Sequence, residues 1–192
     1  MFWIDADAMA TMTFKTDPMK VFIENDLNLM FDHFPGGLTR LPEVKTKMMG
    51  AYGKSICKIS LNKEDGTLEP EFCKEGKKPS VRQVYGFNHI TRLDMYRKES
   101  HQKFLKSLVS DYKFSRKWDD QLAVTVPAVM EDPKKVRDHR LMGVVLGLHH
   151  NTFIDGKDRG KYLSYTNWWA NIGKTNWTVA RSMCDGLVVD LG

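Results

Sequence analysis

The first nine residues constrain the fold of this chain more than any other stretch. Four apolar residues, Met1 to Ile4, lead directly into Asp5 and Asp7, which are separated by a single alanine. An apolar run of this kind predicts a buried β-strand that delivers two carboxylates to the edge of a sheet. Because side chains alternate along a strand, we expect Asp5 and Asp7 to point the same way.

Two carboxylates side by side are costly unless a positive group lies between them. A divalent metal that carries phosphate oxygens is the usual solution, so this stretch predicts a metal-nucleotide site. The competing interpretation is a strand end with two solvated aspartates.

The composition is that of a folded globular protein. A length of 192 residues suffices for one domain, or most of one, with a substantial core. The hydrophobic fraction of 42% and the charged fraction of 28% exclude a disordered or fibrous chain. The net charge of +5 comes from scattered basic residues rather than from an arm that would bind nucleic acid. The sequence contains neither a signal-peptide pattern nor an apolar run of transmembrane length.

Helix and strand signals alternate along the chain. Asp17 followed by Pro18 predicts a helix start, and apolar residues at helical spacing carry that helix to Phe31. The other expected elements are a strand over 55–61, a charged loop over 62–79, a strand over 81–87, a helix that includes residues 95–112, a helix that closes near Pro127, and a strand over 136–141. We expect the strands from Phe2 and Val81 and the segment from Val144 to share one mixed sheet. The helices at Pro18 and Asp94 then cover its faces.

Three polar pairs stand where apolar elements end: Asp5 with Asp7, Asp119 with Asp120, and His149 with His150. Together they form the ligand set expected of a metal-dependent sugar-nucleotide site. Taken singly, Asp119 and Asp120 also fit a helix N-cap, and His149 and His150 also fit a surface loop.

The three cysteines have no metal-ligand spacing. Cys57 and Cys73 flank a polar stretch and can pair if the compartment is oxidising.

Five motifs in a fixed order resemble those of a known enzyme family. Asp5-Ala6-Asp7 stands where that family has Glu-Pro-x, and Asp17-Pro18-Met19 opens a similar apolar helix. The segment from Asp94 to Arg97 resembles an Asp-aromatic-aromatic-Arg helix start. Lys117-Trp118-Asp119-Asp120 is similar to Arg-Trp-Gly-Asp, and Gly147-Leu148-His149-His150 to Gly-Tyr-Gln-His. From Trp3 to about Asp155 the chain therefore resembles the fungal Golgi α-1,2-mannosyltransferases, glycosyltransferase family fifteen.

This resemblance implies an α/β fold of the GT-A type, a mixed sheet flanked by helices. It implies a catalytic part over residues 1–155 with an aromatic-rich segment, 156–192, packed on it. It also implies GDP-mannose as donor, a glycan acceptor, manganese as cofactor and the Golgi or ER lumen as location. Because the expected metal strand starts at residue 1, we expect the chain to lack much of the N-terminal nucleotide-binding half, with any membrane anchor in that missing part.

The resemblance also assigns roles to individual residues. Asp7 and His150 are the expected metal ligands, with His149 as the alternative to His150. Asp5 beside them is expected to contact the sugar or ribose. Asp120 matches the family's active-site aspartate when counted from Trp118, whereas Asp119 takes the place of a glycine, and we expect Trp118 and Asp119 to contact substrate. The family has a glutamate in a Phe-Glu-aliphatic-Gly-Asp stretch, proposed as nucleophile or base. The corresponding stretch here is one residue longer, so that position falls on Asn88 or on His89, which is the candidate base.

Two other interpretations stay open. An apolar strand ending in Asp-x-Asp also opens the haloacid-dehalogenase-like phosphatases, in which the first aspartate attacks phosphorus. That motif has Thr or Val two residues after the second aspartate, where this chain has Met9. The other is a catalytically inactive transferase-like or carbohydrate-binding protein, because neither Asn88 nor His89 is a carboxylate.

Overall fold

The computed structural model describes residues 1–4, 8–10, 16–32, 34, 38–40, 42–85, 88–110, 120–144 and 148–150. Four of the expected site residues, Asp5, Asp7, Trp118 and Asp119, lie outside this described part, as does the segment 156–192. Asp120 and His150 are described by their secondary structure and backbone pairing.

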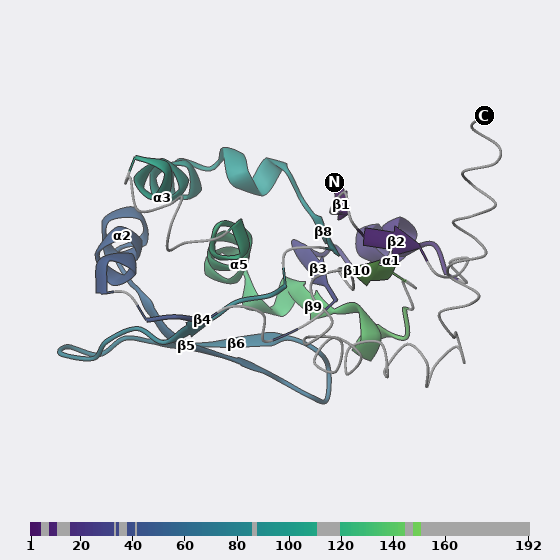
Figure 1. Cartoon of the computed structure of the whole chain (residues 1–192), viewed down its shortest axis with the longest axis horizontal. Helices are drawn as coiled ribbons and strands as arrows, with labels where there is room; N and C mark the ends of the chain where they lie inside the picture. The colour runs from purple at the N-terminus through teal and green to yellow at the C-terminus, as the bar shows by residue number, and fades with distance from the viewer. Residues whose placement is uncertain are drawn as a thin grey trace, which may run out of the picture.

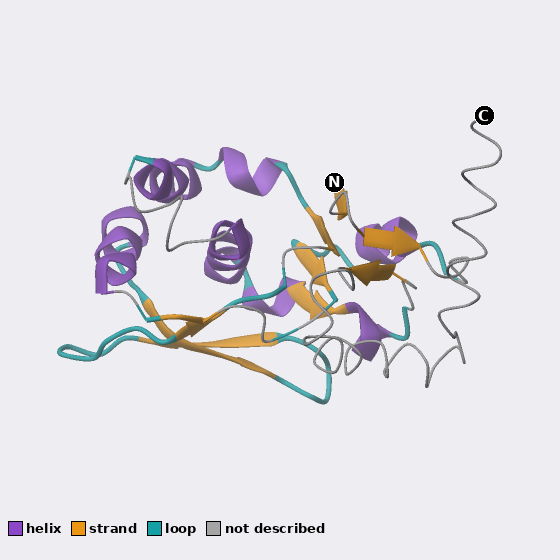
Figure 2. Ribbon diagram, viewed as in Figure 1, coloured by secondary structure: helices purple, strands orange, loops and turns teal. Residues whose placement is uncertain are grey.

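The described part has the mixed α/β architecture that the sequence predicts (Figures 1 and 2). A four-stranded sheet has the order β1 (Phe2–Ile4), β8 (Asn88–Thr91), β3 (Leu29–Phe31) and β9 (Val136–Asp138). Strand β8 is antiparallel to β1 and β3, whereas β3 is parallel to β9, so the sheet is mixed.

Three two-stranded ladders accompany this sheet. They pair β2 (Ala8–Ala10) with β10 (Leu148–His150), β4 (Leu38–Thr39) with β7 (Val81–Arg82), and β5 (Ile56–Leu61) with β6 (Leu68–Phe72). The α-helices are α1 (Pro18–Glu24), α2 (Pro42–Tyr52), α3 (Glu99–Val109) and α5 (Asp120–Glu131). Short 3-10 helices η1 (Asp94–Arg97), η2 (Pro133–Lys135) and η3 (His139–Met142) connect them.

Both faces of the four-stranded sheet are covered by apolar packing. Leu29 and Phe31 belong to the larger core cluster, which includes residues of α2, α3 and α5. Met30 and Ile90 belong to a smaller cluster with Phe22 of α1. Figure 1 shows α2, α3 and α5 grouped on one side of the molecule and α1 on the other. Because successive side chains of a strand face opposite ways, β3 needs apolar residues at every position, and all three are fully buried.

The hairpin of β5 and β6 is joined by a disulfide between Cys57 and Cys73, whose Cα atoms are 4.7 Å apart. This confirms the pairing that the sequence allows. The hairpin turn packs against the sheet because the carbonyl of Gly66 accepts a hydrogen bond of 2.9 Å from the amide of Asp138. Gly66 has φ +77°, and an added Cβ would lie 3.1 Å from the Cβ of Leu141. Glycine at this turn therefore permits both the left-handed backbone and the close approach.

The predicted helix from Pro18 to Phe31 is wrong in its second half. Its start is confirmed, since Asp17 caps α1 by accepting from the amides of Met19 and Lys20. The helix ends at Glu24, however, and Asp26 adopts a left-handed backbone with φ +48°. Residues 29–31 then form the buried strand β3. Their apolar run fits helical spacing, but burial on both faces of the sheet decides the outcome.

The predicted composition of the sheet is also corrected. Strand β1 belongs to the mixed sheet, but Val81 pairs with β4, and residues 148–150 pair with β2. The neighbour of β1 is residues 88–91, expected as a connection to a helix. Strand β1 is an edge strand of this sheet, so Trp3 and Ile4 are 43% and 41% exposed rather than buried.

Further differences concern element boundaries. Helix α5 passes through Pro127 and ends at Glu131, since apolar contacts of Ala128 and Val129 hold its last turns in the core. The expected loop over 62–79 contains β6, because pairing with β5 supplies hydrogen bonds to a polar strand. The expected strand 136–141 ends at Asp138, which caps η3 by accepting from the amide of Arg140.

Candidate functional site

Strand register brings five polar residues to one edge of the four-stranded sheet. Phe31, the last residue of β3, pairs with His89 on one side and with Asp138 on the other. Asn88 precedes His89, Asp32 follows Phe31, and His139 follows Asp138, so all lie at the same end of their strands. We call this set the polar sheet edge: Asp32, Asn88, His89, Asp138 and His139. Each of these five residues is at most 6% exposed. Polar groups that are buried to this extent normally have hydrogen-bond partners.

Asp32 and His139 form a buried pair at this edge. The Nε2 atom of His139 lies 2.6 Å from Asp32 Oδ1, and its Nδ1 atom lies 2.6 Å from the carbonyl oxygen of Val144. A backbone carbonyl can only accept, so Nδ1 carries a hydrogen. The contact with Asp32 then needs a second hydrogen, on Nε2 or on the carboxyl group. The pair is thus arranged to hold a proton between an imidazole and a carboxylate.

Asp138 is held by Arg140. The Nε and Nη2 atoms of Arg140 donate to the two carboxylate oxygens of Asp138, with distances of 3.1 Å or less. Burial lowers the pKa of the Arg140 guanidinium, but the hydrogen bonds to Asp138 and the negative charges of Asp138 and Asp32 together raise that pKa above its ordinary value. This bidentate pair neutralises a fully buried carboxylate without a further ligand.

Asn88 differs from the other members of the edge. It is fully buried, yet neither its Oδ1 nor its Nδ2 atom has a hydrogen-bond partner within the described part of the chain. Leaving such a group unpaired costs about 1–3 kcal/mol per group. The neighbouring His89 stacks on Trp3 of β1, with ring centroids 6.2 Å apart and an interplanar angle of 18°.

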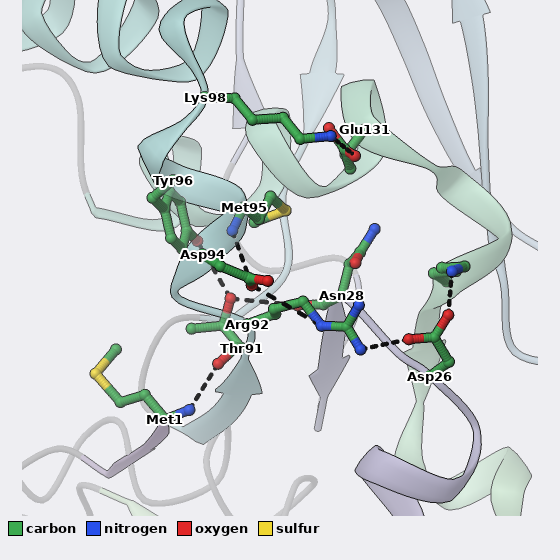
Figure 3. Close-up of polar contacts among 11 residues, drawn as sticks. Met1, Asp26, Asn28, Thr91, Arg92, Asp94, Met95, Tyr96, Lys98 and Glu131 are labelled. Carbon is green, nitrogen blue, oxygen red and sulfur yellow. Dashed lines mark hydrogen bonds and ion pairs between the residues drawn. The ribbon is translucent and has the colours of Figure 1, made fainter.

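The opposite end of β8 is fixed by polar contacts that orient the strand (Figure 3). The N-terminal amine of Met1 donates to the carbonyl of Thr91 at 2.7 Å. The Nη2 atom of Arg92 lies 2.5 Å from Asp26 Oδ1, and Lys135 donates to the other oxygen of that carboxylate. The hydrogen bond from Lys135, then that from Arg92, lowers the pKa of Asp26 from 3.8 to about 2. These contacts join the starts of β3 and β9 to the end of β8.

The pairing of β2 with β10 bears on the expected metal ligands. His150 is the register partner of Ala8, and His149 is the partner of Met9. Asp7 lies outside the described residues, but one peptide bond joins it to Ala8. The register thus brings both candidate histidines beside β2, the strand that follows Asp7.

Asp120 is the first residue of α5, the position that the sequence predicts. Among the described residues no group of three His, Cys, Asp or Glu side chains is arranged to hold a metal ion. The expected metal ligands include Asp7, which lies outside the described residues, so this finding does not test that ligand set. Carboxylate oxygen and imidazole nitrogen, the atoms that Asp7 and His150 offer, fit a manganese ion.

Sequence reasoning did not identify Asp32 and His139 as site residues. Asp32 follows the apolar run Leu29 to Phe31 just as Asp5 follows Met1 to Ile4, so the same strand-end pattern marks it. His139 follows Val136 to Asp138, which the sequence predicts as strand. Both signals depend on recognising where these strands end.

Comparisons with known proteins do not assign the chain to a class. No family model, no curated protein and no solved structure matches it. Within the described residues, no helix is both long enough and apolar enough to cross a membrane.

Proposed function

We propose that this chain is the catalytic part of a metal-dependent glycosyltransferase. The reaction moves a sugar, with mannose from GDP-mannose as the first choice, from a nucleotide donor to a hydroxyl group of a glycan. The observation that carries the proposal is the β2–β10 register, which brings His149 and His150 beside the strand that follows Asp7. The resemblance of the motifs supplies the reaction class.

The proposed ligand pair fits the chemistry of a nucleotide-sugar donor. Asp7 and His150 offer one carboxylate and one imidazole to a divalent cation, and a bound cation neutralises the pyrophosphate that leaves. Ile4 is the register partner of Asn88, and three residues separate Ile4 from Ala8, so β2 starts within about 15 Å of Ile4. We propose that Asp5, which belongs to that connection, contacts a sugar or ribose hydroxyl.

Asp120 and His89 are the residues proposed for proton transfer. An ionised carboxylate at the start of α5 can take the proton of the acceptor hydroxyl or stabilise positive charge at the anomeric carbon. His89 lies at the sequence position where the family has its glutamate. Its imidazole is a candidate base, but an imidazole is a poor glycosyl nucleophile. Its burial and its stacking on Trp3 keep the ring in one orientation.

The Cys57–Cys73 disulfide supports an oxidising compartment. We propose the Golgi or ER lumen, where glycan acceptors are found.

Manganese binding tests the proposed ligand pair. The matched variants are His150→Ala and His149→Ala, with Asp7→Asn as a third, measured by isothermal titration with MnCl₂ and GDP. We expect His150→Ala and Asp7→Asn to weaken manganese binding at least about tenfold, because each removes one ligand. His149→Ala should leave it nearly unchanged. Equal affinities in all four proteins would remove this pair from the proposal.

Sugar transfer tests the reaction itself. The wild-type protein is assayed with a panel of GDP- and UDP-sugars and with mannosides as acceptors, beside Asp120→Asn and His89→Ala. We expect a loss of about 10²–10⁴-fold in kcat for Asp120→Asn, the usual contribution of a positioned general base. Absence of turnover with every donor would contradict the enzymatic proposal.

A second candidate is a sugar-binding protein without transferase activity. Asn88 and His89 favour it, because the position expected to hold a carboxylate is occupied by an amide or an imidazole. Binding of a glycan without nucleotide or metal, in the absence of transfer, would support this candidate.

A further inference from the structure

The side chain of Asn88 is the one member of the polar sheet edge whose hydrogen-bonding atoms are unpaired within the described residues. Asp32 has His139 and Asp138 has Arg140 at this edge, so the fold does satisfy buried polar groups here. At the other end of the same strand, Thr91 Oγ1 donates to the carbonyl of Asn28 at 3.3 Å. An unpaired buried amide lowers stability, and such groups persist where a ligand uses them.

We propose that Asn88 binds two neighbouring hydroxyl groups of a hexose. This assignment rests on the proposed function, since the hexose would be the one that the donor nucleotide carries. The position supports a ligand contact, because Asn88 is the first residue of β8 and lies at the end of the strand rather than in its middle. It shares a strand face with Ile90, two residues further along.

The chemistry of the amide selects the ligand class. Oδ1 can only accept hydrogen bonds and Nδ2 can only donate them. A phosphate oxygen only accepts and would leave Oδ1 unpaired, whereas a metal ion bound to Oδ1 would leave Nδ2 unpaired. A hydroxyl group both donates and accepts. Two hydroxyls on adjacent carbons therefore satisfy both atoms of Asn88 at once, which neither a phosphate nor a cation does.

The test compares Asn88→Leu with Thr91→Val on the same strand. Leucine replaces both unpaired atoms by methyl groups on the same branched skeleton, so we expect an equal or higher melting temperature together with weaker sugar binding. Thr91→Val removes a paired hydroxyl, so it should lower the melting temperature and leave sugar binding unchanged. Sugar binding is measured with methyl α-mannopyranoside by NMR, following the side-chain NH₂ signal of Asn88, and with GDP-mannose against GDP by calorimetry in MnCl₂.

The expected result is a shift of the Asn88 NH₂ signal on sugar addition. We also expect an at least tenfold lower affinity of Asn88→Leu for GDP-mannose, with the affinity for GDP unchanged. Binding of the mannoside through Asn88 without any nucleotide binding would sustain this inference while contradicting the proposed function. An unmoved NH₂ signal, with equal GDP-mannose affinity in Asn88→Leu and wild type, would overturn the inference and leave the transferase proposal standing. A lower melting temperature of Asn88→Leu with unchanged sugar affinity would also overturn it.

Discussion

The Nε2 atom of His139 lies 2.6 Å from the Oδ1 atom of Asp32, although 107 residues separate the two in the chain. This contact ties the end of β3 to η3, and the hydrogen bond from His139 to Val144 extends it towards β10. Both side chains are more than 90% buried. The pair therefore connects the core of the sheet to the segment that leads to His149 and His150.

We predict that Asp32→Ala destabilises the protein by roughly 3–5 kcal/mol, because it leaves a buried imidazole without its carboxylate partner. Urea unfolding at pH 7 measures this loss. Glu75→Ala, which changes an exposed carboxylate, is the control and should alter the free energy of unfolding by less than about 0.5 kcal/mol. A loss no larger than that of the control would show that the pair has little structural role.

Asp26 should titrate far below a free aspartate. Its folded pKa of about 2 lies below the ordinary value of 3.8, so its contribution to stability is present above that value and is lost as pH falls from about 4 through 2. We expect ¹³C NMR of the carboxyl group to show this, and Lys135→Gln to raise the pKa towards 3.8. Lys134→Gln, at the adjacent exposed position, should not. An Asp26 pKa near 3.8 in the wild-type protein would contradict the geometry.

Glu131 links three side chains across the helices. Lys98 donates to its carboxylate, His101 Nε2 lies 3.1 Å from Oε2, and the Tyr52 hydroxyl lies 3.0 Å from His101 Nδ1. The hydrogen bond from Lys98 is the largest effect that lowers the pKa of Glu131. Its stabilisation is therefore present above the unfolded pKa and is lost as pH falls through the folded one.

Glu131→Gln should cost about 1–3 kcal/mol at pH 7, since hydrogen bonds to a charged group are replaced by weaker ones. The difference from wild type should shrink as the pH falls through the lowered pKa of Glu131, where the wild-type carboxylate becomes protonated. Thermal unfolding from pH 7 to pH 3 measures both effects. A difference that stays constant over this range would contradict the assigned ionised state.

Reduction of the Cys57–Cys73 disulfide should lower the free energy of unfolding by about 3 kcal/mol, the value expected for a loop of this length. The measurement is urea unfolding with and without dithiothreitol. The double variant Cys57→Ser, Cys73→Ser should resemble the reduced wild type and be insensitive to the reductant. Equal stability of oxidised and reduced wild type would argue against the bridge.

Gly66 and Gly76 offer a matched test of close packing. Both have positive φ, +77° and +75°, so alanine at either position should cost about 1–2 kcal/mol in backbone strain. Only Gly66 has neighbours near the added Cβ, whereas no atom lies within 4 Å at Gly76. We expect Gly66→Ala to be the more destabilising of the two in urea unfolding. Equal losses would show that the hairpin turn does not pack closely against Asp138 and Leu141.

Local sequence signals determined the elements that are specified by residues only a few positions apart. Asp17 and Pro18 start α1 because a capping carboxylate and a fixed φ act within one turn. The alternation over 55–61 predicts β5, and the mixed α/β class follows from the succession of helix and strand signals. These features depend on residues a few positions apart, so the sequence alone contains them.

Tertiary structure decided which segments pair and which polar groups meet. Leu29 to Phe31 form a strand because two cores cover its faces, although the spacing of their side chains fits a helix equally well. The Asp32–His139 pair and the unpaired amide of Asn88 exist because β3, β8 and β9 align in one register. Pairing in the four-stranded sheet joins residues more than 50 positions apart in the chain, and no local pattern encodes which distant strand completes this sheet.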